Sequence, residues 1–382
     1  MKPIKVMSIF GTRPEAIKMA PLLLEFQGRP EIESICTLTA QHREMLDGVM
    51  ALFGLRAEYD LDIMEPGQSL YTITAKALTG LGRVLSEVRP DFVFVHGDTT
   101  TTFSAALAAF YAKIPVGHVE AGLRSGDLHS PFPEELNRKL VGQIAALHFA
   151  PTAGNAENLR RDGITDGIFV TGNTVIDAMR HTLDRFSGTF GNQLDQIDWI
   201  NRRVIALTCH RRENYGKPMA EIFTAAKTLT ERHPDVELVY PVHPSPAVQE
   251  AAQAILGGVP RVHLIDPLDT VQMHALLAKS YLVMTDSGGL QEEAPALGKP
   301  VLVLRRETER PEAVTAGTVR LAGVSSDDIL RLGEQLLTDP LAYAAMAAAV
   351  NPYGDGKAAG RIADALLWHF GHSAQPPGDF CP

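Results

Sequence analysis

The sequence predicts an α/β protein with parallel sheets, because one pattern recurs along it. Short apolar runs, rich in Val and Ile, give way abruptly to small and charged residues. Such runs, with helical stretches behind them, are typical of buried parallel strands. The runs are Ile4–Phe10, Phe92–His96, Val116–Val119, Val204–Cys209, Leu238–Val242 and Tyr281–Thr285. Ligands bind beyond the carboxyl ends of such strands, where the polar residues of this chain follow.

The length and the order of the segments predict two domains. A chain of 382 residues exceeds the size at which one hydrophobic core stops growing. Strand and helix alternate through the first half, a less periodic segment over 177–200 is interpreted as a connector, and a second alternation begins at Val204. We therefore expect two Rossmann-like domains facing a cleft, the first over 1–172 and the second over 173–355.

The remaining elements follow from helical spacing and from apolar runs. Pro14 suits the opening turn of a helix after the first strand. The other expected helices lie over 44–53 and 70–88, and the other expected strands over 147–150, 168–171, 236–242, 262–265 and 301–304. Ile362 and Leu366 belong to a stripe that predicts a C-terminal helix, and the tail over 373–378 is expected to be disordered.

Composition and charge exclude several classes of function. The net charge of −10 argues against a nucleic-acid partner and against an anionic membrane surface. The three cysteines, Cys36, Cys209 and Cys381, are widely spaced and predict neither a disulfide framework nor a zinc site. No apolar stretch has the length of a membrane span, so we expect a soluble cytoplasmic protein. No metal motif occurs, and no glycine-rich dinucleotide or P-loop motif follows a strand, so we expect neither a metal nor a cofactor.

Carboxylates follow the strands of the first domain. Asp98 follows Phe92–His96 and could simply cap the next helix. Glu120 is harder to explain structurally, because a carboxylate at the end of a buried strand is costly unless it is paired or used. Glu134 and Glu135 could be ordinary first-turn helix acids. Converging on one cleft, these groups would suit acid–base work.

Histidine, arginine and glycine follow the strands of the second domain. His210 and His243 each come directly after a strand, and Arg211 beside His210 suits a phosphate. Ser287, Gly288 and Gly289 stand at a strand-to-helix turn, which is either a plain tight turn or a phosphate site. One of the acids Glu292 and Glu293 is a candidate for a ribose hydroxyl.

Taken together, these strings resemble one family from about residue 4 to about residue 370, in order. The strings are Gly11-Thr12-Arg13-Pro14-Glu15, His96-Gly97-Asp98-Thr99, Glu120-Ala121-Gly122-Leu123-Arg124, Pro133-Glu134-Glu135-Leu136-Asn137-Arg138, His210-Arg211-Arg212-Glu213-Asn214, Asp286-Ser287-Gly288-Gly289 and Thr308-Glu309-Arg310-Pro311-Glu312. The chain resembles the bacterial non-hydrolysing UDP-N-acetylglucosamine 2-epimerases. The resemblance implies a GT-B architecture whose C-terminal helix, over 356–372, crosses back to complete the first domain.

The resemblance also implies roles for residues. The first domain would be the sugar side, with the catalytic carboxylates, and the second would bind UDP. The catalytic group would be Lys18, Asp98, Glu120, Glu134, Arg138 and His210. The UDP portion would be held by Arg13, His210, Ser287, Gly288, Gly289, Glu293 and Arg310, with Met273 where the family usually has an aromatic residue beside the uracil.

Some members of the family are activated by a second substrate molecule. Gln41, His42 and His243 match the residues that would bind it. Glu44 and Gly67, however, stand where those members have Gln and Arg, so we expect weak or absent activation.

The implied reaction is reversible epimerisation at C2 of UDP-GlcNAc to UDP-ManNAc, which supplies ManNAc units for surface polysaccharide. C2 is not next to a carbonyl, so the expected route is anti elimination of UDP to 2-acetamidoglucal and re-addition. The expected partners are these small molecules, and the expected assembly is a homodimer. Three alternatives stay open: a hydrolysing epimerase that releases ManNAc and UDP, a GT-B glycosyltransferase, and a non-catalytic UDP-sugar sensor.

Overall fold

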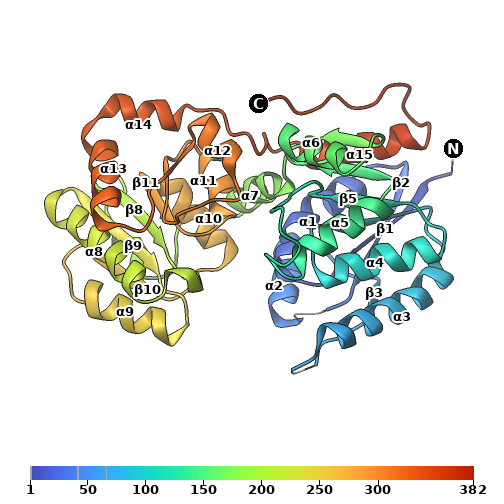
Figure 1. Ribbon diagram of the computed structural model, residues 1–382, viewed down its shortest axis with the longest axis horizontal. Helices are drawn as coiled ribbons and strands as arrows, with labels where there is room; N and C mark the ends of the chain where they lie inside the picture. The colour runs from blue at the N-terminus through green and yellow to red at the C-terminus, as the bar shows by residue number, and fades with distance from the viewer. Residues whose placement is uncertain (1, 41–42, 66) are drawn as a thin grey trace. The chain divides into compact units, whose positions relative to one another are not determined.

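The computed structural model describes residues 2–40, 43–65 and 67–382, with the backbone alone for residues 43–45. The chain divides into two compact units. Unit 1 comprises Met1–Ala178 and Tyr353–Pro382, and unit 2 comprises Met179–Pro352. Figure 1 shows that each unit is a sheet covered by helices, so the predicted α/β class is confirmed. Among the described residues, no helix is long and apolar enough to cross a membrane.

Unit 1 contains a seven-stranded parallel sheet in the order β3-β2-β1-β4-β5-β6-β7. Its strands are β1 (Ile4–Phe10), β2 (Ile32–Leu38), β3 (Tyr59–Asp60), β4 (Phe92–His96), β5 (Val116–Val119), β6 (Leu147–Ala150) and β7 (Ile168–Val170). Its helices are α1 (Arg13–Gln27), α2 (Arg43–Phe53), α3 (Leu70–Val88), α4 (Thr100–Tyr111), α5 (Glu134–Ile144), α6 (Ala153–Arg161) and α15 (Ala358–His369). Helix α7 (Thr174–Asp184) contains the boundary between the units.

Unit 2 repeats this plan with six parallel strands in the order β10-β9-β8-β11-β12-β13. The strands are β8 (Arg203–Thr208), β9 (Val236–Pro241), β10 (Val262–Ile265), β11 (Leu282–Thr285), β12 (Val301–Val303) and β13 (Val319–Leu321). The helices are α8 (Lys217–Arg232), α9 (Pro246–Leu256), α10 (Thr270–Lys279), α11 (Leu290–Ala296), α12 (Pro311–Ala316), α13 (Ser326–Thr338) and α14 (Pro340–Ala347), with short 3₁₀ turns over Gln193–Gln196 and Arg212–Asn214. Both strand orders are those of a Rossmann fold.

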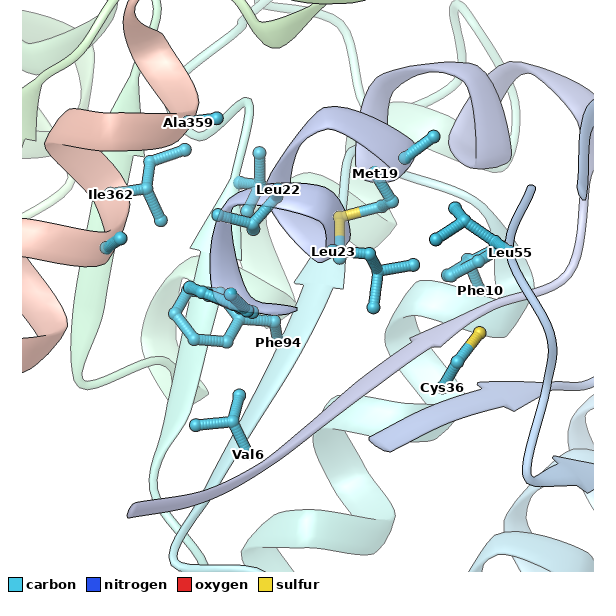
Figure 2. Packing of buried hydrophobic residues seen from close by; sticks show 14 of the residues in the cluster. Val6, Phe10, Met19, Leu22, Leu23, Cys36, Leu55, Phe94, Ala359 and Ile362 are labelled. Carbon is cyan, nitrogen blue, oxygen red and sulfur yellow. The ribbon is translucent and has the colours of Figure 1, made fainter. Parts of the chain in front are cut away.

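The C-terminal helix belongs to the core of unit 1, as predicted. Figure 2 shows Ala359 and Ile362 of α15 beside Leu22 of α1, with Phe94 of β4 close by. Ile362 and Leu366 are fully buried at helical spacing, and the small alanines between them allow the two helices to approach closely. Residues far apart in sequence thus share one core.

Two expectations about irregular segments need correction. The segment over 177–200 contains the boundary between the units, but it begins inside α7, because Val175, Ile176 and Met179 form a buried helical stripe. The tail over 373–378 is not disordered, because it leads to Phe380, whose ring is buried and whose backbone N–H donates to the Val170 carbonyl at 2.7 Å. The Val170 N–H in turn donates to Asp379 Oδ1 at 2.9 Å, so the tail caps the edge of the sheet at β7.

Candidate active site

The strand order of each sheet reverses at one point, between β1 and β4 in unit 1 and between β8 and β11 in unit 2. At such a switch point the loops at the carboxyl ends diverge and leave room for a ligand. In unit 1 these loops carry Arg13 and Asp98, and in unit 2 they carry His210 and Ser287. The topology therefore brings most of the sequence-predicted residues to the ligand-binding edges of the two sheets.

Glu120 is the most constrained carboxylate of unit 1. It directly follows β5, is 8% exposed, and has a φ of +61°, a left-handed conformation that non-glycine residues seldom adopt. Its Oε1 pairs with Lys18 Nζ from α1 and accepts a hydrogen bond from Asn173 Nδ2 at 2.9 Å. Its Oε2 lies 3.6 Å from His96 Nε2. A buried, charge-paired carboxylate in a strained backbone is thus held in one orientation.

Asp98 forms a second charged pair beside the first. Its Oδ2 accepts a hydrogen bond from Arg138 Nε at 2.8 Å and forms an ion pair with Arg138 Nη2 at 2.6 Å, and its backbone carbonyl accepts a hydrogen bond from Asn137 Nδ2 at 2.8 Å. Arg138 and Asn137 lie on α5, so this helix fixes the loop after β4. Because β4 pairs with β5, with His96 opposite Val119, Asp98 and Glu120 follow neighbouring strands.

The two acids that begin α5 have different surroundings. Glu135 is fully buried, and it accepts hydrogen bonds from the backbone N–H groups of Ser125 and Gly126 and pairs with Arg138 at 3.1 Å. Glu134 is half-buried, and no hydrogen bond or ion pair joins its carboxylate to another described residue. Glu135 therefore holds the loop, whereas the carboxylate of Glu134 makes no such contact with the described residues.

Glu15 connects the two loops at the switch point of unit 1. Its Oε2 accepts hydrogen bonds from the N–H groups of Gly11 and Thr12, and its Oε1 accepts bonds from the hydroxyls of Thr99 and Thr102 at 2.6 and 2.8 Å. Burial raises the pKa of Glu15 above its ordinary value, although these donors counteract the shift. Glu15 and Arg13 both lie in the first turn of α1. The bonds of Glu15 therefore connect the start of this helix, with Arg13, to the loop that carries Asp98.

In unit 2, His210 is positioned by a buried carboxylate. Asp286 Oδ2 accepts hydrogen bonds from the N–H groups of His210 and Arg211, both at 2.9 Å, and from Asn214 Nδ2 at 3.1 Å. The imidazole of His210 lies 3.6 Å from Asp286 Oδ1 and stacks on His243, with ring centroids 5.3 Å apart. Burial lowers the pKa of His210, which favours the neutral ring.

The remaining candidates of unit 2 lie around the turn after β11. Ser287, Gly288 and Gly289 are half-buried, and a β-carbon added at Gly288 would lie 3.7 Å from Arg211 Nη2. Glu293 Oε2 is 3.4 Å from His274 Nε2. Arg310 pairs with the buried Glu292, which leaves Glu293 as the acid facing the glycines. Met273 is half-buried on α10, next to His274.

The residues expected to bind an activating molecule are only partly described. Gln41 and His42 lie outside the described residues, and for Glu44 only the backbone is described. His243 is described, and its Nδ1 accepts a hydrogen bond from the Ser245 N–H at 3.1 Å. Its stacking on His210 places a residue expected to be regulatory against one expected to be catalytic.

Several residues that position the candidates were not identified from sequence. Asn173, His96, Asp286 and His274 all contact a candidate side chain. The contacts join positions far apart in the chain, with 53 residues separating Glu120 from Asn173 and 76 separating His210 from Asp286. Asp286 and His96 stand in strings that carry the family resemblance, which was a signal available in the sequence.

Comparison with known proteins gives one consistent answer. A family model described as UDP-N-acetylglucosamine 2-epimerase matches residues 24–367. The UDP-N-acetylglucosamine 2-epimerase of Bacillus subtilis is 54% identical over 382 residues, which cover 100% of this chain and 99% of the relative.

Solved structures agree. The crystal structure of UDP-GlcNAc 2-epimerase from Neisseria meningitidis bound to UDP-GlcNAc has a TM-score of 0.87 and 49% identity, and the match covers 96% of this chain and 100% of that one. A structure of Anabaena HepE in complex with UDP and glucose is 16% identical with a TM-score of 0.61, covering 96% of this chain and 100% of that one. At this low identity, the likeness shows the GT-B-like fold alone.

Proposed function

Because the chain belongs to the UDP-N-acetylglucosamine 2-epimerase family, we propose that it interconverts UDP-GlcNAc and UDP-ManNAc without hydrolysing them. The observation that carries this proposal is the pair of carboxylates after β4 and β5, each matched to its own cation. Asp98 is bonded to Arg138, and Glu120 to Lys18. A binding protein has no need of two acid–base groups, one buried and one half-buried, at one sheet edge, whereas a reaction that moves a proton on each face of a sugar carbon does.

The first half of the reaction removes the C2 proton and UDP together. A carboxylate takes the proton, the electron pair of the C–H bond forms the C1=C2 double bond, and the C1–O bond breaks with its electron pair leaving on UDP. The intermediate is 2-acetamidoglucal, whose C2 is planar. We assign Glu120 as the base for this anti elimination, because Lys18 and Asn173 hold its orientation. Asp98 and Glu134 are the acid–base candidates for the other face.

The departing diphosphate needs positive charge and hydrogen-bond donors. We propose that Arg13, His210 and Arg310, with the turn Ser287-Gly288-Gly289, hold the UDP part, and that Glu293 binds a ribose hydroxyl. In this assignment unit 1 is the sugar side and unit 2 binds UDP. The half-buried Arg211, whose guanidinium lies beside Gly288, adds charge at the same turn.

Re-addition completes the reaction without net loss of any group. UDP attacks C1 of the glycal, and C2 takes a proton from the opposite face, which gives the epimer. A hydrolysing epimerase would instead add water at C1 and release ManNAc with UDP. Retention of UDP is therefore the property that distinguishes the two alternatives.

Epimerisation in D₂O tests this proposal. The purified protein with UDP-GlcNAc should give UDP-ManNAc that carries deuterium at C2, as followed by NMR, with little free ManNAc. Glu120→Gln should lower turnover about 100-fold or more while UDP affinity by calorimetry stays within a few-fold, since the amide keeps the shape and loses the base. Product that retains its C2 hydrogen, or stoichiometric free ManNAc, would overturn the proposed route.

We further propose that the enzyme is a homodimer. Its product would supply ManNAc units for surface polysaccharide, and its substrate would activate it weakly or not at all. Phe110 and Tyr111 of α4 are 60% and 67% exposed, and Leu136 and Leu140 of α5 are 41% and 37% exposed, which is apolar surface that a second copy could cover. Light scattering over a range of concentrations would give the mass of the assembly, and the rate should depend hyperbolically on UDP-GlcNAc.

A further inference from the structure

Three polar side chains of unit 2, from three different helices, contact one another in series and end at the candidate ribose-binding acid. Thr182 lies on α7, His274 on α10 and Glu293 on α11. Thr182 is fully buried, His274 is 4% exposed, and the side chain of Glu293 is 13% exposed. Polar groups at this depth cost free energy unless they are paired. Each of the three is therefore expected to depend on its neighbour.

The hydrogen bonds of Thr182 fix the orientation of the His274 ring. The Thr182 hydroxyl donates to the Met179 carbonyl oxygen at 2.8 Å, and this bond uses its single proton. The same hydroxyl oxygen lies 2.6 Å from His274 Nδ1. Because its own proton is engaged, the hydroxyl oxygen accepts in this second bond, and Nδ1 is the donor. The ring is thus held with Nδ1 toward α7 and with Nε2 on the side of Glu293.

The two carboxylate oxygens of Glu293 have different neighbours. Oε2 lies 3.4 Å from His274 Nε2. Oε1 lies beside the glycine turn, since a β-carbon added at Gly289 would be 3.2 Å from it. Glu292 pairs with Arg310 instead, and among the described residues no other ion pair joins Glu293. His274 therefore contacts one oxygen of Glu293, while the other borders the turn assigned to UDP in the proposed function.

We propose that His274 is a positioning residue for Glu293: fixed by Thr182, its ring holds Oε2, so that Oε1 is presented to a ribose hydroxyl of the nucleotide. The inference rests on the proposed function, in which Glu293 binds that hydroxyl. The buried ring limits the rotamers open to the glutamate side chain, so less ordering is needed when the nucleotide binds. When the ring carries both protons, the Nε2–H group adds charge attraction to the contact.

Nucleotides with and without ribose hydroxyls test this role. The probes are UDP and 2′,3′-dideoxy-UDP, which share the base and the diphosphate, and calorimetric titration gives the affinity of each. His274→Phe keeps a ring and removes both nitrogens, whereas Thr182→Val keeps the shape of the side chain and removes the hydroxyl. His263→Phe is the matched control, because the half-buried His263 is also in unit 2 and its Nε2 lies 2.7 Å from Glu237, which is not a candidate site residue.

We expect the wild type to bind UDP about 10-fold or more tightly than dideoxy-UDP, the effect of a hydrogen bond from a hydroxyl to a carboxylate. His274→Phe should weaken UDP binding about 5-fold and change dideoxy-UDP binding by less than about 2-fold, and Thr182→Val should act in the same direction. Glu293→Ala should remove the preference for UDP. Adding His274→Phe to it should change nothing further, because His274 acts through Glu293. His263→Phe should bind both nucleotides as the wild type does.

A His274→Phe protein that keeps the full preference for UDP would overturn the role of His274. So would an equal loss of affinity for both nucleotides, since that pattern marks a packing role. If His274→Phe does not fold, the same comparison in Thr182→Val decides. A wild type that binds the two nucleotides equally contradicts instead the ribose contact of Glu293, which belongs to the proposed function, so the two failures are distinguishable.

Discussion

Asp286 takes no part in the proposed reaction, yet its carboxylate accepts hydrogen bonds from three donors. Its Oδ2 accepts from His210 N–H, Arg211 N–H and the Asn214 amide, and the side chain is fully buried. Removing the carboxylate leaves these donors unsatisfied and releases the loop after β8. The turn that presents His210 is thus fixed by a residue from another strand.

We therefore predict that Asp286→Ala weakens UDP binding by about 10-fold or more, the effect of losing charge-assisted hydrogen bonds. Calorimetric titration with UDP measures the loss. Asp327→Ala, at an exposed position in the first turn of α13, is the control and should bind UDP normally. Normal UDP affinity in Asp286→Ala would show that the loop holds its shape without this carboxylate.

Buried histidines on neighbouring strands tie stability to pH. Burial lowers the pKa of His96 to about 4, of His118 to about 3 and of His148 to about 4. Between these values and the ordinary pKa near 6.5, the unfolded chain binds more protons than the folded one. Each histidine therefore removes stability as pH falls through that window. Asp177 acts in the opposite direction, since burial raises its pKa to about 6.

Comparing the pH dependence of stability in the wild type and in a variant isolates the contribution of one histidine. The side chain of His148→Gln cannot take up a proton. As pH falls from about 6.5 to 4, the free energy of unfolding of this variant should therefore fall less steeply than that of the wild type, and the two slopes should differ by up to about 1.4 kcal/mol per pH unit. Urea titrations of wild type and variant at pH 7, 6 and 5 supply the two slopes. Parallel slopes would mean that His148 has the same pKa in the folded and unfolded states.

At the scale of elements, two glycines allow the cost of a strained backbone to be distinguished from the cost of a steric clash. Gly122 and Gly163 have similar left-handed φ values of +89° and +85°. A β-carbon at Gly122 would lie 2.2 Å from the Asn155 carbonyl oxygen, whereas at Gly163 nothing lies within 4 Å. Gly122 therefore allows the loop after β5 to approach α6 closely.

Substitution by alanine should reveal the difference. We expect Gly163→Ala to cost about 1 kcal/mol of unfolding free energy, the price of the φ alone. Gly122→Ala should cost roughly 3 kcal/mol or more, because the backbone of α6 must also move. Chemical denaturation compares the two, and equal losses would show that the loop and α6 separate freely.

The pattern of elements was predictable where each strand carries its own signal. β1, β4, β5, β6 and β10 begin and end at the predicted residues, since their apolar runs stop at a change in polarity. β2 was not identified, because Glu33 and Ser34 interrupt the apolar run of Ile32–Leu38. α7 was missed because it begins a segment whose later part is rich in Gly and Asn. The types of site residue follow from sequence, whereas partners such as Asn173 depend on the tertiary fold.

At the scale of the whole molecule, unit 1 depends on residues from both parts of the chain. The face of α15 that carries Ala359, Ile362 and Leu366 is buried in the core that α1 and β4 begin. Arg361 adds hydrogen bonds to the Thr171 carbonyl and to Asp355, and lies 5.3 Å from the ring centroid of Phe380. Without this segment a broad apolar surface on α1 would meet water.

Truncation at the two ends of this segment tests the dependence. A chain that stops after residue 352 should lose the cooperative unfolding of unit 1, because burial of several large apolar side chains is lost at about 1.5–3 kcal/mol each. A chain that stops after residue 372 lacks the contacts that Asp379 and Phe380 make with β7, and it should unfold cooperatively at a lower temperature. Calorimetry distinguishes the outcomes, and an unchanged transition in the shorter chain would contradict this view of the core.

The discontinuous make-up of unit 1 also matters while the protein is being synthesised. Residues 179–352 emerge from the ribosome before 353–382, and at about 5–20 residues per second this separates the two parts of unit 1 by roughly 10 seconds or more. Unit 2, being continuous, can fold during that interval, whereas the nascent first half carries an apolar face of α1 that α15 has not yet covered. Exposed apolar surface of this kind makes a nascent chain prone to aggregation until α15 arrives.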